Sequence, residues 1–461
     1  MAAAAMSDAS NCPRGSLWRK WDLHTHTPAS ILNNGFLRLA DGKPDWESYV
    51  AALEQTDLAV LGVTDYFTIE GYKKLREYKS QGRLSNISCL LPNVEFRLDK
   101  IISSRRDGGR PRRLNFHVIF SDAVSPEIIE EHFLHDLDFE YEGHPQTAIG
   151  TRKLKVSNIR DLGNRLAKEH EAFADSNPLE LGASKIVVSM DQILRALQDD
   201  RLKGRYLLVL PEELSSLIDW NGQDHQVRKV LLQQSDMVFS PNPKTRQWCL
   251  GRDPYAAGVD AYIEEFKSLK PCIHGADAHS LEELNRPCAK RSGKHRCAAQ
   301  PTECDMRYLW VKADPTFDGL TQLRWEPDSR VYIGSSPPDV LMPELTIQSV
   351  STVKLPWLLD SGIEINPGLV AVIGARGSGK TALLDLIAHG ASSALPLSST
   401  DSFLSRAAGH MRRGRVHLVW SLGETRENGF EPFSEEVEAD VHYLSQQLLS
   451  ACARPKGSTT S

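Results

Sequence analysis

The stretch "WDLHTHTPAS", residues 21–30, decides how the first part of the chain is interpreted. Two histidines, His24 and His26, stand one residue apart at the end of a short apolar segment. In a β-strand, residues i and i+2 project from the same face, so the two imidazoles would point the same way. That arrangement suits a metal ion, and two ordinary histidines near the amino terminus are an equally good interpretation of this segment alone.

The composition is that of an ordinary soluble globular protein. The chain has 461 residues, of which 41% are hydrophobic and 25% charged, and its length favours two or three domains. The net charge of −6 gives no reason to expect a globally basic nucleic-acid-binding protein. The chain starts without a secretory signal pattern, no run is apolar enough to span a bilayer, and the 8 cysteines form no compact framework. We therefore expect a cytoplasmic protein with no membrane segment.

Polar residues follow or interrupt apolar runs at several later points. Asp65 ends "LAVLGVTD", Glu95 lies in "ISCLLPNVEF", His117 lies in "LNFHVIFSD", and "KPCIHGADAH" holds Asp277 and His279. Segments with helical character, such as "SYVAALEQ" and "VDAYIEEFKSLK", lie between these runs. Alternating strands and helices predict an α/β fold with parallel strands. In a barrel of that kind, functional side chains lie at the carboxyl ends of the strands.

Changes in composition divide the chain. Residues 121–200 are polar and irregularly helical, which indicates an insertion. Ser and Pro cluster at residues 332–344, which indicates a boundary. We therefore expect a first domain over 18–335 and a second over 345–450, followed by a disordered polar tail at 451–461.

The polar residues of these runs form a candidate set of nitrogen and oxygen metal ligands. Such donors suit Mn, Zn or Fe rather than a thiolate site. A shared carboxylate such as Glu95 could bridge two ions, and two ions about 3.5–4 Å apart can activate water and stabilise the leaving oxygen in phosphoryl hydrolysis. For any single residue, a hydrogen-bonded polar group is the ordinary alternative. The set comprises His24, His26, Glu95, His117, Asp277 and His279.

These motifs, in this order, resemble those of the PHP (polymerase and histidinol phosphatase) superfamily over roughly residues 18–335. The matching segments are "DLHTHTPAS", "GVTDYF", "LPNVEF", "NFH" and "HGADAHS". Members of the superfamily are distorted (β/α)7 barrels with a two- or three-metal phosphoesterase site, so the resemblance implies that fold and that activity. It further implies that one ion is held by His24, His26, Glu95 and Asp277, its neighbour by Glu95 and His117, and a third position by His279. Catalytic roles would fall to Asp65, Glu95 and Asp277.

Two positions depart from that pattern. The family usually has Asp-His where this chain has Asp65–Tyr66, so one third-site ligand is replaced by a phenol. A further family histidine aligns with Leu210, for which Glu212 or His225 could substitute. With these changes, the resemblance implies at most two metal ions and weaker occupancy of the second.

A basic segment, "SSRRDGGRPRR", separates Glu95 from His117. Its Gly and Pro residues exclude a regular helix, so we expect a flexible loop beside the predicted site. Arginine forks match phosphate geometry, and a nucleic-acid backbone would be attracted to them. A solvated surface loop is the alternative. The arginines are Arg105, Arg106, Arg110, Arg112 and Arg113.

The second domain contains a phosphate-binding loop motif. "GARGSGKT", residues 374–381, satisfies G-x-x-x-x-G-K-[ST], follows the apolar "LVAVI", and opens the helical "ALLDLIA". Its glycines Gly374, Gly377 and Gly379 would turn backbone amides toward phosphates. Lys380 would reach the β- and γ-phosphates of ATP, and the Thr381 hydroxyl would hold Mg²⁺.

The segments around this loop resemble the head of an ATP-binding-cassette or SMC-like ATPase. "LTIQSV" and "GIEINPGLVAVIG" are similar to its opening strands, and "RVHLVWSL" and "VHYLSQQ" are expected strands that flank the turn region "GETRENG". Gln446 resembles the Q-loop glutamine, although a plain surface glutamine is as good an interpretation. No S-G-G-Q signature and no apolar run ending in Asp-Glu follows. Either the chain is a truncated form of a longer protein, or a partner supplies the missing half. The resemblance also suggests a dimer formed through the head. We expect weak ATP binding without useful hydrolysis.

Together the two parts resemble the bacterial TrlF family, in which an SMC-like ATPase is fused to a PHP domain. The resemblance implies a metal-dependent phosphoesterase coupled to ATP binding, with nucleic acid as the preferred substrate. A small-molecule phosphate ester is the alternative substrate. A catalytically degenerate metal- and nucleotide-binding regulatory module is the other alternative, which Tyr66 and Leu210 favour.

Overall fold

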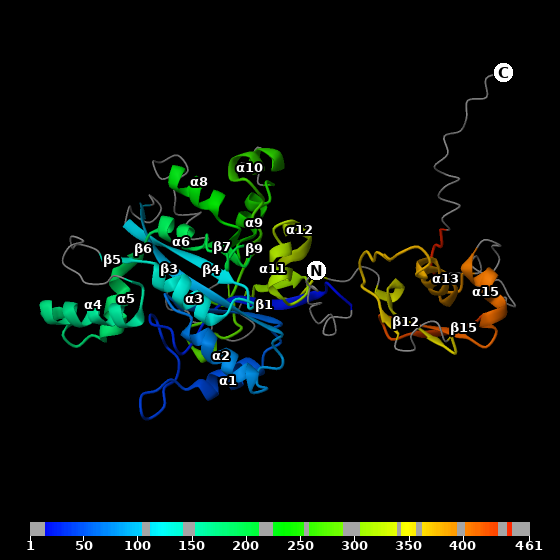
Figure 1. The fold of residues 1–461 in the computed structure, drawn as a ribbon, viewed down its shortest axis with the longest axis horizontal. Helices are drawn as coiled ribbons and strands as arrows, with labels where there is room; N and C mark the ends of the chain where they lie inside the picture. The colour runs from blue at the N-terminus through cyan, green and yellow to red at the C-terminus, as the bar shows by residue number, and fades with distance from the viewer. Residues whose placement is uncertain are drawn as a thin grey trace, which may run out of the picture. The chain divides into compact units, whose positions relative to one another are not determined.

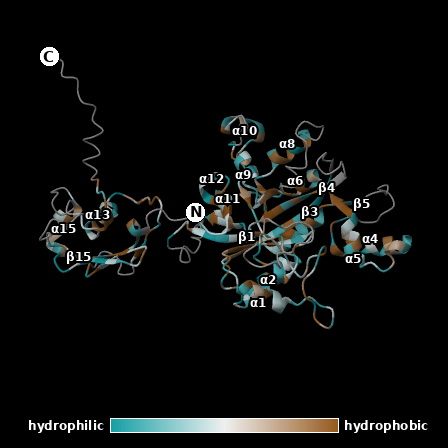
Figure 2. Ribbon diagram, turned by 180° about the vertical axis from the view of Figure 1, so that it is seen from behind, coloured by the Kyte–Doolittle hydropathy of each residue, from teal (hydrophilic) through white to brown (hydrophobic). Residues whose placement is uncertain are grey.

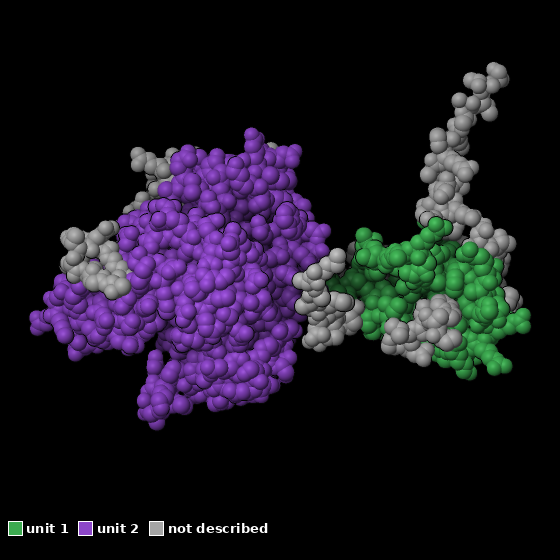
Figure 3. All heavy atoms as spheres, in the orientation of Figure 1, with its two compact units in different colours: residues 1–17, 339–461 green, residues 18–338 purple. Residues whose placement is uncertain are grey.

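The computed structural model separates the chain into two compact units. One unit spans Trp18–Pro338, and the other comprises Met1–Leu17 with Asp339–Ser461 (Figure 3). The described residues are 14–103, 111–141, 153–211, 225–252, 258–288, 305–338, 343–355, 362–393, 402–431 and 440–444.

The larger unit is a mixed α/β structure with a nearly closed, barrel-like sheet (Figure 1). Its strands follow the order β1-β2-β3-β4-β7-β8-β9. The segment after β9 returns to β1, where the Leu23 amide donates to the His274 carbonyl at 3.3 Å and the Asp277 amide donates to the His24 carbonyl at 2.7 Å. These bonds bring the two ends of the sheet together. The strands are β1 Trp18–His26, β2 Val60–Tyr66, β3 Cys89–Ser103, β4 Pro111–Phe120, β7 Tyr206–Pro211, β8 Met237–Phe239 and β9 Cys272–Ile273.

The prediction of parallel strands is wrong for β4. Strands β1, β2 and β3 are parallel, as are β7, β8 and β9, but β4 runs antiparallel to both β3 and β7. The connection from β3 to β4 is a hairpin, which is too short to cross back over the sheet as a parallel connection must. Glu95 therefore lies in the middle of a long strand rather than at its end. Strands β10 (Tyr308–Lys312) and β11 (Val331–Gly334) extend the sheet antiparallel from β1.

Helices pack around this sheet and divide its apolar side chains into two cores. Val50 and Tyr72 belong to the core between the strands and the helices, and Trp21 and Val209 belong to the core that the strands enclose. The strands β3 and β4 are accordingly among the most hydrophobic parts of the ribbon in Figure 2. The helices are α1 Trp46–Glu54, α2 Glu70–Ser80, α8 His225–Gln234, α9 Pro243–Cys249, α10 Val259–Phe266, α11 Phe317–Gln322 and α12 Pro327–Arg330, with the 3-10 turn η5 Leu281–Glu283.

The described residues of 121–200 form a mostly helical segment that is attached to β3. Strand β6 pairs with β3 through Leu98 and Val188, and β5 pairs with β6. Helices α4 and α5 pack so closely that a Cβ at Gly163 would lie 1.7 Å from the Pro178 carbonyl oxygen. The elements are α3 Pro126–His132, η3 Leu134–Asp136, β5 Phe139–Tyr141, α4 Val156–Glu169, η4 Glu171–Phe173, α5 Pro178–Lys185, β6 Ile186–Val188 and α6 Met190–Ala196.

The smaller unit has an antiparallel sheet in the order β13-β12-β14-β15. Its helices α13 and α15 pack on this sheet through a core that includes Leu386, Leu404 and Leu418. The elements are η7 Pro343–Leu345, β12 Ile347–Val353, β13 Ile363–Glu364, α13 Lys380–Gly390, α15 Phe403–Met411, β14 Arg415–Trp420 and β15 Thr425–Gly429.

Two sequence predictions for this unit are wrong, and a third falls only partly on described residues. Residues 369–373, "LVAVI", form no strand; Leu369 is 100% exposed and Ile373 is 88% exposed. A continuous apolar run forms a stable parallel strand only between neighbouring strands, and the described sheet is antiparallel and provides none for it. The expected turn "GETRENG" contains strand β15 instead. Of the expected strand "VHYLSQQ", residues 441–444 form no strand, and the rest lies outside the described residues.

Within the part of the chain that the structure describes, no helix has the length and apolar character needed to cross a membrane.

Candidate metal centre

Strand β1 directs His24 and His26 into one space. Its pairing with β2 shifts register between Asp22 and Thr25, an irregularity that can re-aim side chains. Trp21, which precedes the irregular segment, and Leu23, which lies within it, pack in the enclosed core, whereas His24 and His26 face the site. The irregular strand lies close against β2, because a Cβ at Gly62 would be 2.4 Å from the Leu23 carbonyl oxygen.

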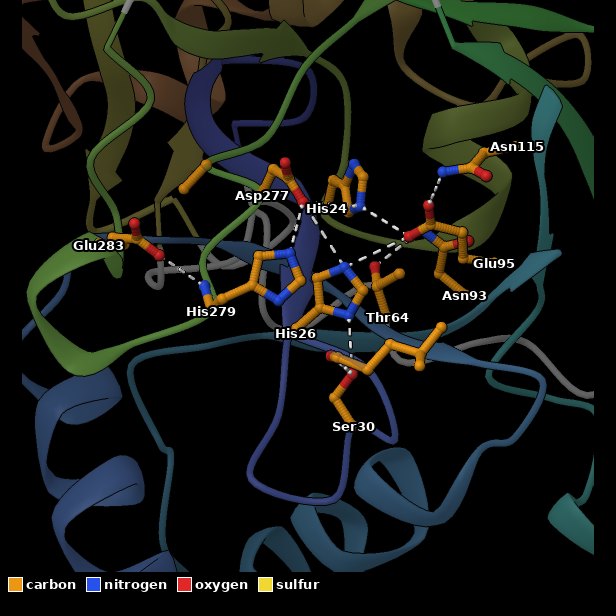
Figure 4. A network of polar contacts seen from close by, with 12 residues as sticks. His24, His26, Ser30, Thr64, Asn93, Glu95, Asn115, Asp277, His279 and Glu283 are labelled. Atoms are coloured by element: carbon orange, nitrogen blue, oxygen red, sulfur yellow. Dashed lines mark hydrogen bonds and ion pairs between the residues drawn. The ribbon is translucent and has the colours of Figure 1, made fainter. Parts of the chain in front are cut away.

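Two imidazoles and two carboxylates converge in this space, as Figure 4 shows. The His24 Nε2 atom lies 3.2 Å from Glu95 Oε2 and 3.3 Å from Asp277 Oδ1. The His26 Nε2 atom lies 3.3 Å from the same Glu95 oxygen and 3.5 Å from the same Asp277 oxygen. The four donor atoms therefore alternate around a common point, and each nitrogen is adjacent to both oxygens.

These distances fit a divalent metal ion. Donors about 2.1–2.2 Å from one ion lie about 3.0–3.5 Å from their neighbours, in either tetrahedral or octahedral geometry. The buried His26 Nε2 atom makes no hydrogen bond, although both carboxylate oxygens are near it. Neither carboxylate oxygen therefore lies along the direction in which this nitrogen would donate or accept a hydrogen bond. Ligands of one shared ion have this arrangement, because the ion itself occupies that direction.

Hydrogen bonds hold the loop after β9 against β1. The Asp277 backbone has φ 48°, an uncommon left-handed conformation, and its amide donates to the His24 carbonyl at 2.7 Å. The buried Asp22 carboxylate accepts from the His24 amide and the Ala276 amide, each at 3.1 Å. Gly275 permits this approach, because a Cβ there would lie 2.4 Å from the His24 nitrogen.

The charges of the cluster shift two pKa values in opposite directions. Burial alone would lower the pKa of His26, but the nearby carboxylates of Asp277 and Glu95 outweigh it and raise that pKa to about 9. Burial alone would raise the pKa of Glu95, but His117, His24 and His26 together hold it well below its ordinary value. Without an ion, the cluster therefore favours a charged carboxylate beside a protonated imidazole.

His117 lies on β4 directly opposite Glu95 in the antiparallel register. Its Nδ1 atom lies 3.2 Å from Asn93 Oδ1, and its buried Nε2 atom makes no hydrogen bond. Burial, opposed by the charge of Glu95, lowers the pKa of His117 to about 3. The ring contacts those of His24 and Phe239 at centroid distances of 4.6 and 4.9 Å.

Sequence reasoning missed two asparagines that orient these side chains. The Asn115 amide donates to Glu95 Oε1 at 2.6 Å, and the Asn93 side chain faces His117. Asn93 precedes Glu95 by two residues, and Asn115 precedes His117 by two. The period of a strand, applied to the residues already singled out, would have indicated both.

His279 joins the cluster through Asp277, whose Oδ1 atom lies 3.3 Å from His279 Nε2. The His279 ring stacks on His26 at a centroid distance of 4.1 Å, and the Glu283 carboxylate accepts from its backbone amide at 2.8 Å. His26, Asp277 and His279 thus form a second group of donor atoms that shares His26 with the first.

The structure does not bring Asp65 into either group. Its fully buried carboxylate accepts from the Thr27 hydroxyl at 2.9 Å and from the Gly71 amide at 3.0 Å, at the start of helix α2. Burial raises the pKa of Asp65 to about 7. The catalytic role expected for Asp65 therefore has no geometric support, because both its hydrogen-bonding partners belong to the scaffold.

Tyr66 and Leu210, the two residues that depart from the family pattern, lie in different surroundings. The Tyr66 ring stacks on His26 at a centroid distance of 4.8 Å, so it borders the site. Leu210 packs in the core between the strands and the helices, because Val209 is the residue of β7 that pairs with His117 and faces inward. His225 begins α8 and lies 3.9 Å from Glu265, so it does not replace a ligand, and Glu212 lies outside the described residues.

The phosphate-binding loop motif lies between β13 and α13. Gly377 and Gly379 have φ values of 82° and 89°, which favour glycine. The Lys380 ammonium donates to the carbonyls of Gly374 and Ala375, each at 2.9 Å, and Thr381 is exposed in the first turn of α13. The loop thus curls around its own lysine. Gln446 lies outside the described residues.

Most of the predicted basic loop also lies outside the described residues, including Arg105, Arg106 and Arg110. The backbone of Arg112 belongs to β4. Arg113 donates to the Asp99 carbonyl, across the β3–β4 hairpin.

Comparison with known proteins adds little to this geometry. No protein-family model and no curated protein matches the chain. Among solved structures, the chain is similar to a Bifidobacterium adolescentis protein that is proposed to be a metal-dependent phosphoesterase. The match has 15% sequence identity and a TM-score of 0.28, and it covers 61% of this chain and 93% of that one. A likeness of this degree carries no argument about the site.

Proposed function

We propose that the larger unit is a metal-dependent phosphoesterase of the PHP type. The observation that carries the proposal is the convergence of His24, His26, Glu95 and Asp277 at donor-to-donor distances of 3.2–3.5 Å. A site of imidazole and carboxylate donors for Mn, Zn or Fe in a barrel-like sheet suits hydrolysis of phosphate esters. The order of sequence motifs supports the same activity.

The residues of the chain would have distinct tasks. The four converging side chains would hold the ion, which when bound supplies polarisation of a phosphoryl oxygen and activation of water. Asn115 fixes the Glu95 carboxylate, and the Ser30 hydroxyl, 3.2 Å from His26 Nδ1, orients that ring. Such partners of ligands hold a metal site in its working geometry.

Nucleic acid is the proposed substrate class, and a small phosphate ester is the alternative. Support comes from the sequence, in which five arginines follow Glu95 between β3 and the start of β4, since basic side chains attract a polyanionic backbone. The five positions are 105, 106, 110, 112 and 113.

A substrate panel with Mn²⁺-loaded protein tests both parts of this proposal. Cleavage of labelled single-stranded DNA or RNA supports the nucleic-acid assignment, whereas turnover restricted to mononucleotides or sugar phosphates supports the alternative. His26→Ala should abolish turnover, and the exposed His170→Ala should keep it as a matched control. Absence of turnover on every substrate would favour a regulatory module without catalysis, the role that Tyr66 near the site also fits.

For the smaller unit we propose ATP binding with Mg²⁺. The supporting observation is the loop of residues 374–379, in which Gly377 and Gly379 adopt positive φ and two carbonyls hold Lys380 at the start of α13. Backbone amides and a helix amino terminus arranged in this way favour phosphate. The ATPase groups that this sequence lacks would have to come from a partner that carries them, because a second copy of this chain in a dimer lacks them too.

Titration calorimetry with ATP and Mg²⁺ tests nucleotide binding. Lys380→Ala should weaken binding at least tenfold, since a charge-assisted hydrogen bond is worth roughly 1.5–3 kcal/mol. Arg413→Ala, which removes an exposed cation from the same unit, should leave the affinity unchanged. Equal affinity in Lys380→Ala and the unaltered chain would contradict the assignment. Hydrolysis that depends on Lys380 in this chain alone would contradict the expectation that the chain binds ATP without useful hydrolysis.

A further inference from the structure

We propose that the metal centre of this chain holds a single ion and that His117 lies outside its ligand shell. This inference rests on the proposed metal-dependent function and narrows it, because the motif resemblance implies two ions, with Glu95 shared between them. The observations concern which donor atoms are free to reach a second ion.

The two groups of donor atoms, one with His24, His26 and Glu95 and the other with His26, Asp277 and His279, surround the same ion position. Both contain His26, and in both the nearby atom is Nε2, since Nδ1 lies against the Ser30 hydroxyl at 3.2 Å. An imidazole nitrogen has one lone pair and cannot bridge two ions. Asp277 likewise presents the same oxygen, Oδ1, to His24, His26 and His279. His279 would therefore bind the same ion and does not form a separate metal site.

Glu95 has only one oxygen directed at this ion. Its Oε2 atom faces His24 and His26, whereas its Oε1 atom accepts the Asn115 amide at 2.6 Å. Because a charged carboxylate can only accept, Asn115 must present its N–H groups to that oxygen. A second ion on the same oxygen would face those hydrogens, so the carboxylate is poorly placed to bridge.

The surroundings of His117 lack further ligands among the described residues. The strand partner of His117 on β7 is Val209, and the ring of Phe239 packs against it at 4.9 Å. The groups of three or more donors found in the described residues do not include His117. Within the described part of the chain, Glu95 and His117 alone would leave an ion with too few protein ligands for stable binding.

The hydrogen bonds around His117 indicate what its free nitrogen can contact. The Asn93 side-chain amide donates to the Leu23 carbonyl at 3.0 Å and to the Thr64 hydroxyl at 2.9 Å, so its oxygen faces His117 Nδ1. His117 must then carry its proton on Nδ1, which leaves the buried Nε2 as an acceptor. Such a nitrogen can accept a hydrogen bond from a water or a hydroxyl group. It cannot accept one from a phosphoryl oxygen, which carries no hydrogen.

The test is the metal content of the full chain without a tag or added nucleotide. The protein is stripped with a chelator, loaded with Mn²⁺, desalted and analysed by mass spectrometry, beside His117→Gln and His26→Gln. We expect one ion per chain in the unaltered protein and in His117→Gln, and none in His26→Gln. Circular dichroism establishes that each variant is folded.

Electron paramagnetic resonance of the unaltered, Mn²⁺-loaded chain gives a second measurement that needs no variant. The expected spectrum is that of an isolated Mn²⁺ ion, without the additional lines of a coupled pair. Two ions with a coupled spectrum would overturn the single-ion inference and leave the proposed phosphoesterase intact. Loss of the ion in folded His117→Gln would also overturn it. No ion under any loading condition would overturn both this inference and the proposed metal dependence.

Discussion

Gly275 lets the loop that carries Asp277 lie directly on strand β1. A Cβ at this position would be 2.4 Å from the His24 nitrogen and 2.5 Å from Asp22 Oδ1. Atoms cannot approach so closely, so any larger residue must push the loop away from the strand. The position of Asp277 relative to His24 and His26 therefore depends on the absence of one methyl group.

Gly275→Ala should weaken metal binding while the chain stays folded. Overpacking of this kind typically costs about 1–3 kcal/mol, which corresponds to roughly a tenfold to hundredfold loss of affinity if it falls on the loop. Competition with a fluorescent chelator measures the affinity. Gly409→Ala is the control, because a Cβ there has no atom within 4 Å. Equal affinity in both variants would show that the loop tolerates displacement.

Single residues of the site could be predicted only as far as strand spacing reaches. His24 and His26 share a face because they are two residues apart, and the same rule would have found Asn93 and Asn115. Asp65 could not be interpreted in this way. Its hydrogen-bond donors, Thr27 and Gly71, come from other segments of the chain. Only the folded structure shows that they donate to its carboxylate.

At the scale of elements, Asp65 connects the end of β2 to the start of α2 and to the segment after β1. It accepts from Thr27, which follows His26, and from Gly71 in the first turn of α2. Burial raises its pKa from 3.8 to about 7. The folded state thus binds a proton at this carboxyl more tightly than the unfolded state does.

This difference predicts a pH-dependent stability. Between about pH 4 and pH 7 the folded chain holds the proton and the unfolded chain does not, so the free energy of unfolding falls as the pH rises. Asp65→Asn cannot ionise and should lack this contribution, so its stability relative to the unaltered chain should rise by roughly 2–4 kcal/mol across that window. Urea unfolding in chelator at several pH values measures it. A constant difference between the two proteins would contradict the burial of a titrating carboxyl.

The helical segment over residues 121–200 depends on a close contact between α4 and α5. A Cβ at Gly163 would lie 1.7 Å from the Pro178 carbonyl oxygen, and one at Gly182 would lie 2.0 Å from the Ile159 carbonyl oxygen. The sequence indicated an insertion here, but the crossing of these helices follows from packing that no local pattern contains.

Gly163→Ala should separate the two helices and lower the free energy of unfolding by about 1–3 kcal/mol. The change leaves β1 and the Asp277 loop untouched, so metal content should stay the same. Urea unfolding and mass spectrometry measure the two quantities on one preparation. A loss of metal would mean that this segment supports the site, and an unchanged stability would mean that α4 can move at little cost.

At the scale of the whole molecule, the structure agrees with the sequence predictions better in the larger unit than in the smaller one. The order of motifs predicted an α/β barrel-like fold, and the structure has a mixed α/β unit with a nearly closed sheet. Alternation of strands and helices could not reveal that β4 runs antiparallel, because strand direction depends on which strands pair. In the smaller unit the apolar run at 369–373 predicted a strand, and the run is exposed instead, since a strand needs neighbours that local sequence does not specify.

The most direct test of the proposed activity measures metal content and phosphodiester hydrolysis on the same samples of the unaltered chain and Glu95→Gln. Gln has the shape of Glu but no charge, so the variant keeps the packing and loses an anionic ligand. We predict that the unaltered chain retains its ion and hydrolyses a phosphodiester, that a chelator abolishes hydrolysis, and that Glu95→Gln loses both ion and turnover. Hydrolysis that persists in chelator, or an unaltered chain that never retains an ion, would contradict the account.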